Sequence, residues 1–144
     1  MFILCAISAG WIGCGGSPGD RRAELPAEQR VVDSFLYGIV QGDPAAVLSA
    51  LPPARLDEIR GDMRHATDEE IGTVLMDALR FDFPYTGIGE ISYRTEEMEG
   101  GTSVVFYWGE FEGADASGRK TTVNEADARS FNLINLDGTW YLAV

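Results

Sequence analysis

Apolar side chains follow a helical spacing in the first half of the chain. They recur at intervals of one, three and four residues, as Val31, Val32, Phe35, Leu36, Ile39 and Val40. One broad apolar stripe of this kind is typical of a helix that buries one face against a core. Pro26 suits the first turn of this helix and Gly42 suits its C-terminal end. The pattern therefore predicts a helix of about 15 residues between them.

Three more helical segments are expected before Pro84. Asp43-Pro44 supplies an N-cap and a first-turn proline for a short helix that Pro52-Pro53 stops, and a second short segment follows at 54–63. Thr67 and Glu70 then have the spacing of a capping box. The apolar residues behind this box keep the helical spacing, as Ile71, Val74, Leu75, Ala78 and Leu79. They predict a second long amphipathic helix.

After Pro84 the apolar period changes to simple alternation, which is typical of half-buried strands. Segment 88–96 alternates, and Gly100-Gly101 predicts a turn into segment 102–112. This second segment is apolar on both faces, so we expect it to be central in a sheet or covered on its second side. The polar stretch 114–120 is typical of a loop.

The last two strands are expected at 128–136 and 139–144. Asp137-Gly138 between them is a strong signal for a two-residue hairpin turn, and Trp140, Leu142 and Val144 share one face of the final strand. Helices followed by a strand meander predict an α+β fold with an antiparallel sheet.

The N-terminal segment differs from the rest because it has no charged side chain before Asp20. Its apolar run, Phe2 to Ile12, has the length of a signal-peptide core and is shorter than the roughly 20 residues of a membrane-spanning helix. The run ends in Gly13-Cys14, which is followed by glycine, serine and proline. This arrangement resembles the bacterial lipobox. An ordinary N-terminal strand or helix, or a general secretory signal, is the alternative interpretation.

The lipobox resemblance implies a division of the chain into three parts. Residues 1–13 are a lipoprotein signal peptide, 14–25 a flexible tether and 26–144 a single α+β domain. Cys14 carries the lipid, whereas Cys5 leaves with the signal peptide. Several acyl chains on one cysteine form a stable anchor, which predicts a location on the extracytoplasmic side of a bacterial membrane, periplasmic or at the cell surface.

The composition restricts the kinds of partner that this domain can bind. The 144 residues contain 23 Asp and Glu against 11 Lys and Arg, a net charge of −12. Such an acidic chain lacks the basic face that nucleic acid requires. The apolar fraction of 45% argues against wholesale disorder, and two cysteines are too few for a disulfide scaffold.

Two stretches together resemble the nuclear-transport-factor-2-like (SnoaL-like, cystatin-like) superfamily. They are Gly42-Asp43-Pro44-Ala45-Ala46-Val47 after the first long helix and the ending 131–142, with its Asp-Gly turn followed by Trp-Tyr-Leu. The resemblance implies N-terminal helices packed on a strongly curved, cone-shaped sheet that encloses a cavity. Members use this cavity as an enzyme site, as a ligand site or not at all, so the fold alone does not decide function.

Enzymes of this superfamily place Asp, His or Tyr groups inside the cone. Asp82 is the best general-base candidate, since its apolar neighbours Phe81 and Phe83 would raise the pKa of an enclosed carboxyl group. A surface position at a helix end is the alternative. His65, the single histidine, lies in a charged stretch and is expected in a solvated loop. Tyrosines that could donate hydrogen bonds in a pocket are Tyr37, Tyr85, Tyr93 and Tyr107.

The one candidate metal site in the sequence consists of acidic residues in the hairpin predicted from segments 88–96 and 102–112. Those that could gather at one end of it and attract calcium are Glu96, Glu97, Glu99, Glu110 and Glu112. They lack the Asp/Asn and glycine pattern of a calcium loop, so a solvated acidic rim is the favoured interpretation. The sequence contains no motif that predicts a bound metal, a cofactor or a set of catalytic residues.

The leading hypothesis is a membrane-anchored extracytoplasmic lipoprotein with a non-catalytic ligand-binding or protein-interaction domain. Its partner would be a small apolar ligand in the cone, or a second copy that docks through the two-sided strand segment 104–111. The alternative is a small cone-cavity enzyme of the ketosteroid-isomerase or dehydratase type that uses Asp82 and a tyrosine. A purely structural envelope protein is the third possibility.

Overall fold

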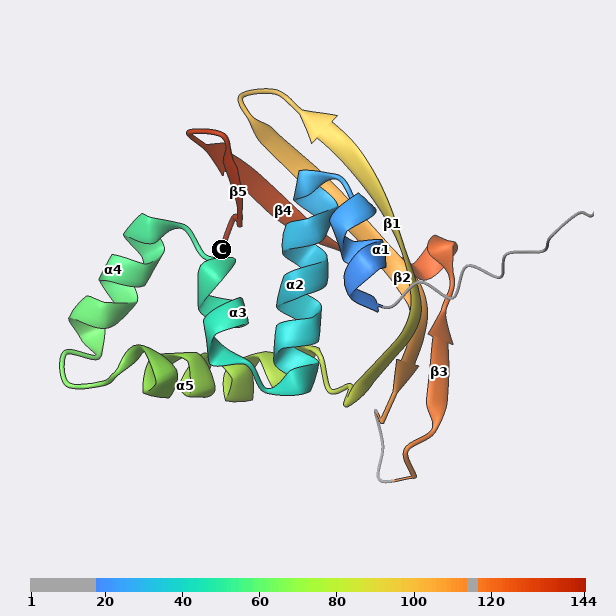
Figure 1. Ribbon diagram of the computed structural model, residues 1–144, viewed down its shortest axis with the longest axis horizontal. Coiled ribbons are helices and arrows are strands. Elements are labelled where there is room, and N and C mark those ends of the chain that lie inside the picture. Colours follow the sequence, from blue (N-terminus) through green and yellow to red (C-terminus); the bar gives the residue numbers. More distant parts are fainter. Residues whose placement is uncertain (1–17, 114–116) are drawn as a thin grey trace, which may run out of the picture.

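A computed structural model describes residues 18–113 and 117–144 of the chain (Figure 1). Gly13 and Cys14 of the predicted lipobox lie outside the described residues. The helices are α1 (Pro18–Glu24), α2 (Ala27–Gln41), α3 (Pro44–Ser49), α4 (Pro53–Asp62) and α5 (Asp68–Asp82). The strands are β1 (Gly87–Met98), β2 (Thr102–Glu112), β3 (Lys120–Val123), β4 (Arg129–Leu136) and β5 (Thr139–Leu142), with a 3₁₀ turn at Glu125–Asp127. The architecture is α+β, as the sequence predicts.

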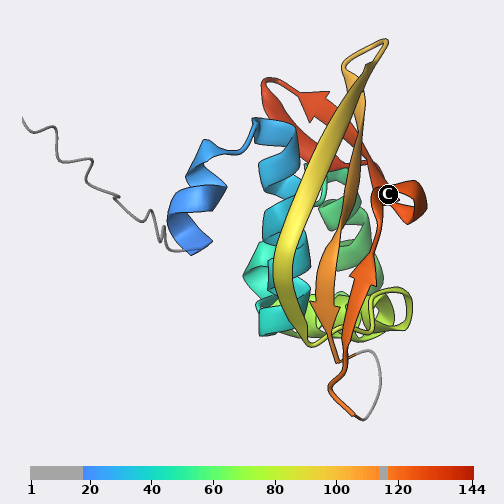
Figure 2. The same cartoon turned by 90° about the vertical axis from the view of Figure 1, so that its right-hand side faces the viewer.

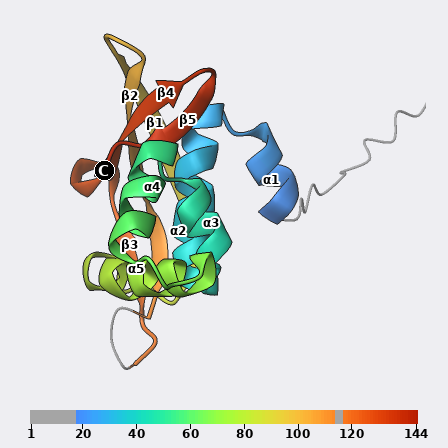
Figure 3. The same cartoon turned by 90° about the vertical axis from the view of Figure 1, so that its left-hand side faces the viewer.

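The five strands form one antiparallel sheet in which β2 is central. β1 pairs with one edge of β2, while β4 and then β3 share the other edge, and β5 extends the sheet beyond β4. The sheet curls strongly around α2, which lies against its concave face, whereas α4 stands away from the sheet and α1 lies beside α2 (Figures 1, 2 and 3). The predicted central position of segment 102–112 is therefore confirmed.

The core lies between α2 and this concave face. Three side chains of α2 are at most 1% exposed, those of Val32, Leu36 and Ile39. They belong to one apolar cluster with fully buried residues of three strands, Val105, Leu133 and Leu142. Each such side chain contributes roughly 1.5–3 kcal/mol through burial, so this stripe is the main source of tertiary stability.

The helix ends follow the signals in the sequence. Gly42 ends α2 in the left-handed conformation, with φ of 69°. The Asp43 carboxylate accepts hydrogen bonds from the backbone N–H groups of Ala45 and Ala46 and so caps α3. Thr67 and Glu70 form the predicted capping box at the start of α5. These local interactions confirm the predicted C-terminal end of α2 and the predicted starts of α3 and α5, whereas α3 ends at Ser49, before the Pro52-Pro53 stop that the sequence predicts.

Three segments differ from the sequence prediction. Residues 18–24, expected in the flexible tether, form α1, because Arg22 has a buried partner on α2 that its local sequence does not reveal. β3 lies in a stretch for which no strand is predicted, since its four residues are too few for an alternating pattern. Val144 is 69% exposed beyond the end of β5, so it does not share the buried face of Leu142.

Among the described residues, no helix combines the length and apolar character needed to cross a bilayer.

A close contact between α3 and α5 generates a stability prediction. A Cβ at Gly72 would lie 2.5 Å from the Pro44 Cβ, whereas a Cβ at Gly61 would meet nothing within 4 Å. We expect Gly72→Ala to lower the free energy of unfolding by roughly 1–3 kcal/mol through overpacking. The matched variant Gly61→Ala, in exposed α4, should raise it by roughly 0.5 kcal/mol through helix propensity. Urea unfolding of both variants measures the difference, and changes of the same sign would contradict the contact.

Candidate functional site

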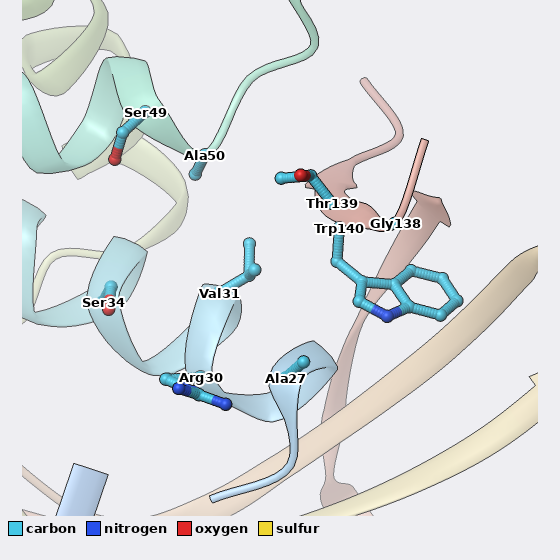
Figure 4. Close-up of a pocket in the computed structure, with 9 residues that line it drawn as sticks. All are labelled: Ala27, Arg30, Val31, Ser34, Ser49, Ala50, Gly138, Thr139 and Trp140. Carbon is cyan, nitrogen blue, oxygen red and sulfur yellow. The ribbon is translucent and has the colours of Figure 1, made fainter. Parts of the chain in front are cut away.

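An open groove lies between the start of α2, the end of α3 and the β4–β5 hairpin (Figure 4). Its volume is about 350 Å³. The lining residues are Ala27, Arg30, Val31, Ser34, Ser49, Ala50, Gly138, Thr139 and Trp140. Helix α2 supplies four of them at the spacing of one helix face, and the hairpin supplies the opposite wall.

Two local features fix the walls of the groove. Asp137 and Gly138 both have positive φ, 53° and 87°, which is the tight hairpin turn that their sequence predicts. Beyond the turn, the backbone N–H of Leu142 donates to the Ala50 carbonyl oxygen at 2.8 Å. This bond ties β5 to the end of α3, so the hairpin and the helices hold a fixed separation across the groove.

The polar side chains of the groove are one guanidinium, which only donates hydrogen bonds, an indole N–H and three hydroxyls, which can donate or accept. Arg30 is exposed and forms no ion pair with any described residue, and the Ser34 and Thr139 hydroxyls have no hydrogen-bond partner there either. The Ser49 hydroxyl donates to the Ala46 carbonyl at 2.9 Å and keeps its acceptor capacity. Among the described lining residues there is no carboxylate, imidazole or thiol. The groove therefore has the chemistry to bind a ligand and lacks an acid–base pair.

A second polar cluster surrounds Asp33, on the other side of α2. Asp33 is only 5% exposed, although it carries a carboxylate. The Arg22 Nε donates to its Oδ2 at 2.6 Å, and the Tyr93 hydroxyl donates to its Oδ1 at 2.8 Å. The Arg22 guanidinium also lies 5.0 Å from the centre of the Tyr37 ring. These contacts dock α1 against α2 and β1 and leave a cavity of only about 40 Å³.

Burial keeps two core tyrosines in their neutral form. The pKa of Tyr93 lies far above its ordinary value, because burial disfavours the phenolate and the adjacent Asp33 carboxylate repels it. Burial also raises the pKa of Tyr107, although the neighbouring Arg129 opposes this shift. Both hydroxyls are therefore hydrogen-bond donors across the neutral pH range and are unsuited to act as bases.

The structure does not enclose the predicted general-base candidate. Asp82 is the last residue of α5 and is exposed, whereas Phe83 beside it is buried. Its backbone carbonyl accepts a hydrogen bond from Arg129 at 2.8 Å. The apolar neighbours in the sequence do not surround the carboxylate, because the helix ends there and Phe81, 90% exposed, turns outward. Asp82 thus occupies the surface position that the sequence left as the alternative.

The remaining candidates are distributed over the molecule. His65 is exposed in the turn between α4 and α5, as expected. Tyr85 stacks on Phe111 with ring centres 4.7 Å apart, and Tyr107 stacks on Phe131 at 5.6 Å. These two rings fill the core, and Tyr37 and Tyr93 belong to the Asp33 cluster, so no common pocket unites the four tyrosines.

The acidic residues of the β1–β2 hairpin do not gather at one end. Glu97 lies opposite Ser103 near the hairpin turn, whereas Glu112 lies opposite Gly87 at the far end of the same strand pair. Glu112 instead forms an ion pair with Lys120 of β3 at 3.3 Å. The long antiparallel register separates residues that the sequence expectation grouped together. Across the described part of the chain, no cluster of three or more His, Cys, Asp or Glu side chains could hold a metal ion.

Sequence reasoning missed both Asp33 and the groove. The signal for Asp33 was a charged residue between Val32 and Phe35 within the apolar stripe, and its partner Arg22 fell in the expected tether. The signal for the groove was Trp140 directly after a hairpin turn, but its facing wall comes from residues 27–34 and 49–50. Because these parts lie far apart in the sequence, no local pattern of residues predicts the groove.

Comparisons of the chain with protein-family models, with curated proteins and with solved structures found no match. The structure itself defines the class of fold. It is an α+β domain whose N-terminal helices pack on a strongly curled antiparallel sheet of five strands, an arrangement consistent with nuclear-transport-factor-2-like domains.

The raised pKa of Tyr93 generates a pH prediction. Its contribution to stability is fully present below the ordinary tyrosine pKa of about 10 and is lost as the pH rises above that value. Tyr93→Phe should lower the free energy of unfolding by roughly 1.5 kcal/mol at neutral pH and flatten its decline above about pH 10. Urea unfolding from pH 7 to 11 tests this, with Tyr141→Phe as control, since the Tyr141 hydroxyl has no hydrogen-bond partner among the described residues. Equal pH profiles for the two variants would contradict the assignment.

Proposed function

We propose that this chain is a lipid-anchored protein on the extracytoplasmic side of a bacterial membrane, and that its domain binds a small ligand without transforming it. The observation that carries the proposal is the groove of about 350 Å³, whose apolar walls bear hydrogen-bond donors with no intramolecular partner among the described residues. Binding sites for small molecules have this combination of apolar lining and a few convergent polar groups.

The anchor part of the proposal rests on the sequence. Gly13-Cys14 at the end of an uncharged apolar run supports acylation of Cys14. The first described helix begins at Pro18, four positions after Cys14 in the sequence. A domain attached through so short a segment would be held close to the bilayer surface.

The geometry favours binding over the alternative of a small cone-cavity enzyme. That alternative needs a carboxylate and a tyrosine facing a substrate cavity, and Asp82 is exposed instead. Asp33 and Tyr93 do form a carboxylate–tyrosine pair, but Arg22 bonds the second Asp33 oxygen and the cavity beside them is only about 40 Å³. A second copy docking through the outer face of β2 has less support, because the outward side chains of this strand are already half-buried and the Arg94 guanidinium lies over the Phe106 ring, 4.7 Å from its centre.

Replacement of the predicted lipid site tests the anchor. Cys14→Ser should release the protein from the membrane fraction and abolish incorporation of labelled palmitate, because the serine hydroxyl does not replace the thiol in lipoprotein acylation. Cys5→Ser is the matched control, since the predicted cleavage removes Cys5, and it should stay in the membrane fraction. Equal membrane retention and equal labelling of the two variants would contradict lipidation at Cys14.

Filling the groove tests the binding part. Ala27→Trp places an indole at the groove from an exposed position in the first turn of α2. We expect native mass spectrometry of the purified wild-type chain to show a bound small molecule that Ala27→Trp loses. Ala54→Trp is the control, because Ala54 is also exposed, also follows a proline and lies in the first turn of α4 outside the groove. A ligand retained by Ala27→Trp, or absent from both proteins, would contradict the proposed site.

A further inference from the structure

The charge of the groove is opposite in sign to the net charge of the chain. Acidic residues outnumber basic residues by 23 to 11, yet none of the nine lining residues is acidic. By contrast, the hollow between α4 and α5 is lined by Asp62, Glu69 and Glu70. The groove therefore carries one positive charge and no acidic side chain, on a chain whose net charge is −12.

Arg30 supplies the positive charge of this site. The other arginines of the helices mostly have acidic partners: Arg22 pairs with Asp33, Arg60 with Asp68 and Arg80 with Asp77. Arg30 pairs with no described residue. Of the two carboxylates on its own helix, Glu28 is two residues away and so does not face it, and Asp33 is buried and engaged by Arg22 and Tyr93. Its guanidinium is available to an external anion.

Hydroxyl groups and an indole extend the donor set. Ser34 lies one turn after Arg30 on the same face of α2, and Thr139 lies on the opposite wall (Figure 4). The half-buried Trp140 adds a flat aromatic surface with an N–H group that has no partner among the described residues. Val31, Ala27 and Ala50 are apolar, and Val31 projects between the helix and the hairpin in Figure 4.

We infer that the ligand of the groove is a small amphipathic carboxylic acid, free in solution, whose carboxylate pairs with Arg30 and whose apolar body packs on Val31 and Trp140. This inference rests on the binding groove of the proposed function and specifies its ligand class. Charge complementarity selects an anionic group, and a guanidinium binds a carboxylate by two parallel N–H···O bonds. The groove volume of about 350 Å³ lies at the low end of the range for ligand pockets. It limits the apolar part of the ligand to a small group, such as one ring on a short chain.

The test compares an acid with its uncharged isostere. We expect titration calorimetry of the purified full-length chain to show that 4-phenylbutyrate binds at least tenfold more tightly than 4-phenylbutanamide. Arg30→Gln should weaken binding of the acid by roughly tenfold to a hundredfold, and Arg30→Lys by less, because one charge-assisted bond has that magnitude. Arg119→Gln is the control, since it removes the same charge from an exposed position outside the groove and should leave binding unchanged.

Three outcomes would overturn the inference. If acid and amide bind equally and Ala27→Trp abolishes both, the groove binds ligands but does not select an anion, and the proposed function stands without the inference. If the chain binds phosphatidylglycerol vesicles in an Arg30-dependent manner and not 4-phenylbutyrate, the anion is a lipid headgroup. If neither probe binds at up to about 10 mM and no co-purified ligand is lost in Ala27→Trp, the proposed function fails as well.

Discussion

The burial of one face of α2 in the curl of the sheet is the constraint on which the rest of the structure depends. Val32, Leu36 and Ile39 enter a cluster that also contains buried side chains of β2, β4 and β5. Strands can contact a single helix from several sides only if their sheet curves around it. The large apolar area that α2 brings out of water stabilises this curvature, and the positions of the other helices and of the β4–β5 hairpin follow from it.

The two sides of α2 next to this buried face differ: α1 covers the side of Asp33, whereas the side of Val31 lines the groove. Successive residues on a helix point about 100° apart, so Val31 and Asp33 project to either side of the buried Val32. Asp33 meets Tyr93 and Arg22, and α1 closes that flank with an ion pair of 2.6 Å. On the side of Val31, α3 ends at Ser49 and the hairpin turns at Asp137-Gly138, so none of the described elements covers the helix and a groove remains. The same buried residue thus separates a closed structural flank from an open one that is available to a ligand.

The ion pair between Arg22 and Asp33 also places part of the expected tether 14–25 in the folded domain. Arg22 belongs to the folded domain because a buried carboxylate without its partner would be strongly destabilising. Helix α1 is consequently a docked element, and it precedes the end of α2 that lines the groove. In the proposed lipoprotein, docking of α1 would hold the groove at a restricted distance from the bilayer, and the net charge of −12 would repel anionic lipid.

The sequence by itself determined the elements whose signals are local. The stripe on α2, the Asp43 cap, the Thr67–Glu70 box and the Asp137-Gly138 turn depend on residues within a few positions of one another, and all appear in the structure. Only the tertiary structure decided the positions of Asp33, Asp82 and the groove. The partner of Asp33 on β1 lies 60 residues away, and the groove joins the start of α2 to a hairpin at the end of the chain. Burial and pairing across such separations depend on how the sheet curves, which no local pattern of polar and apolar residues encodes.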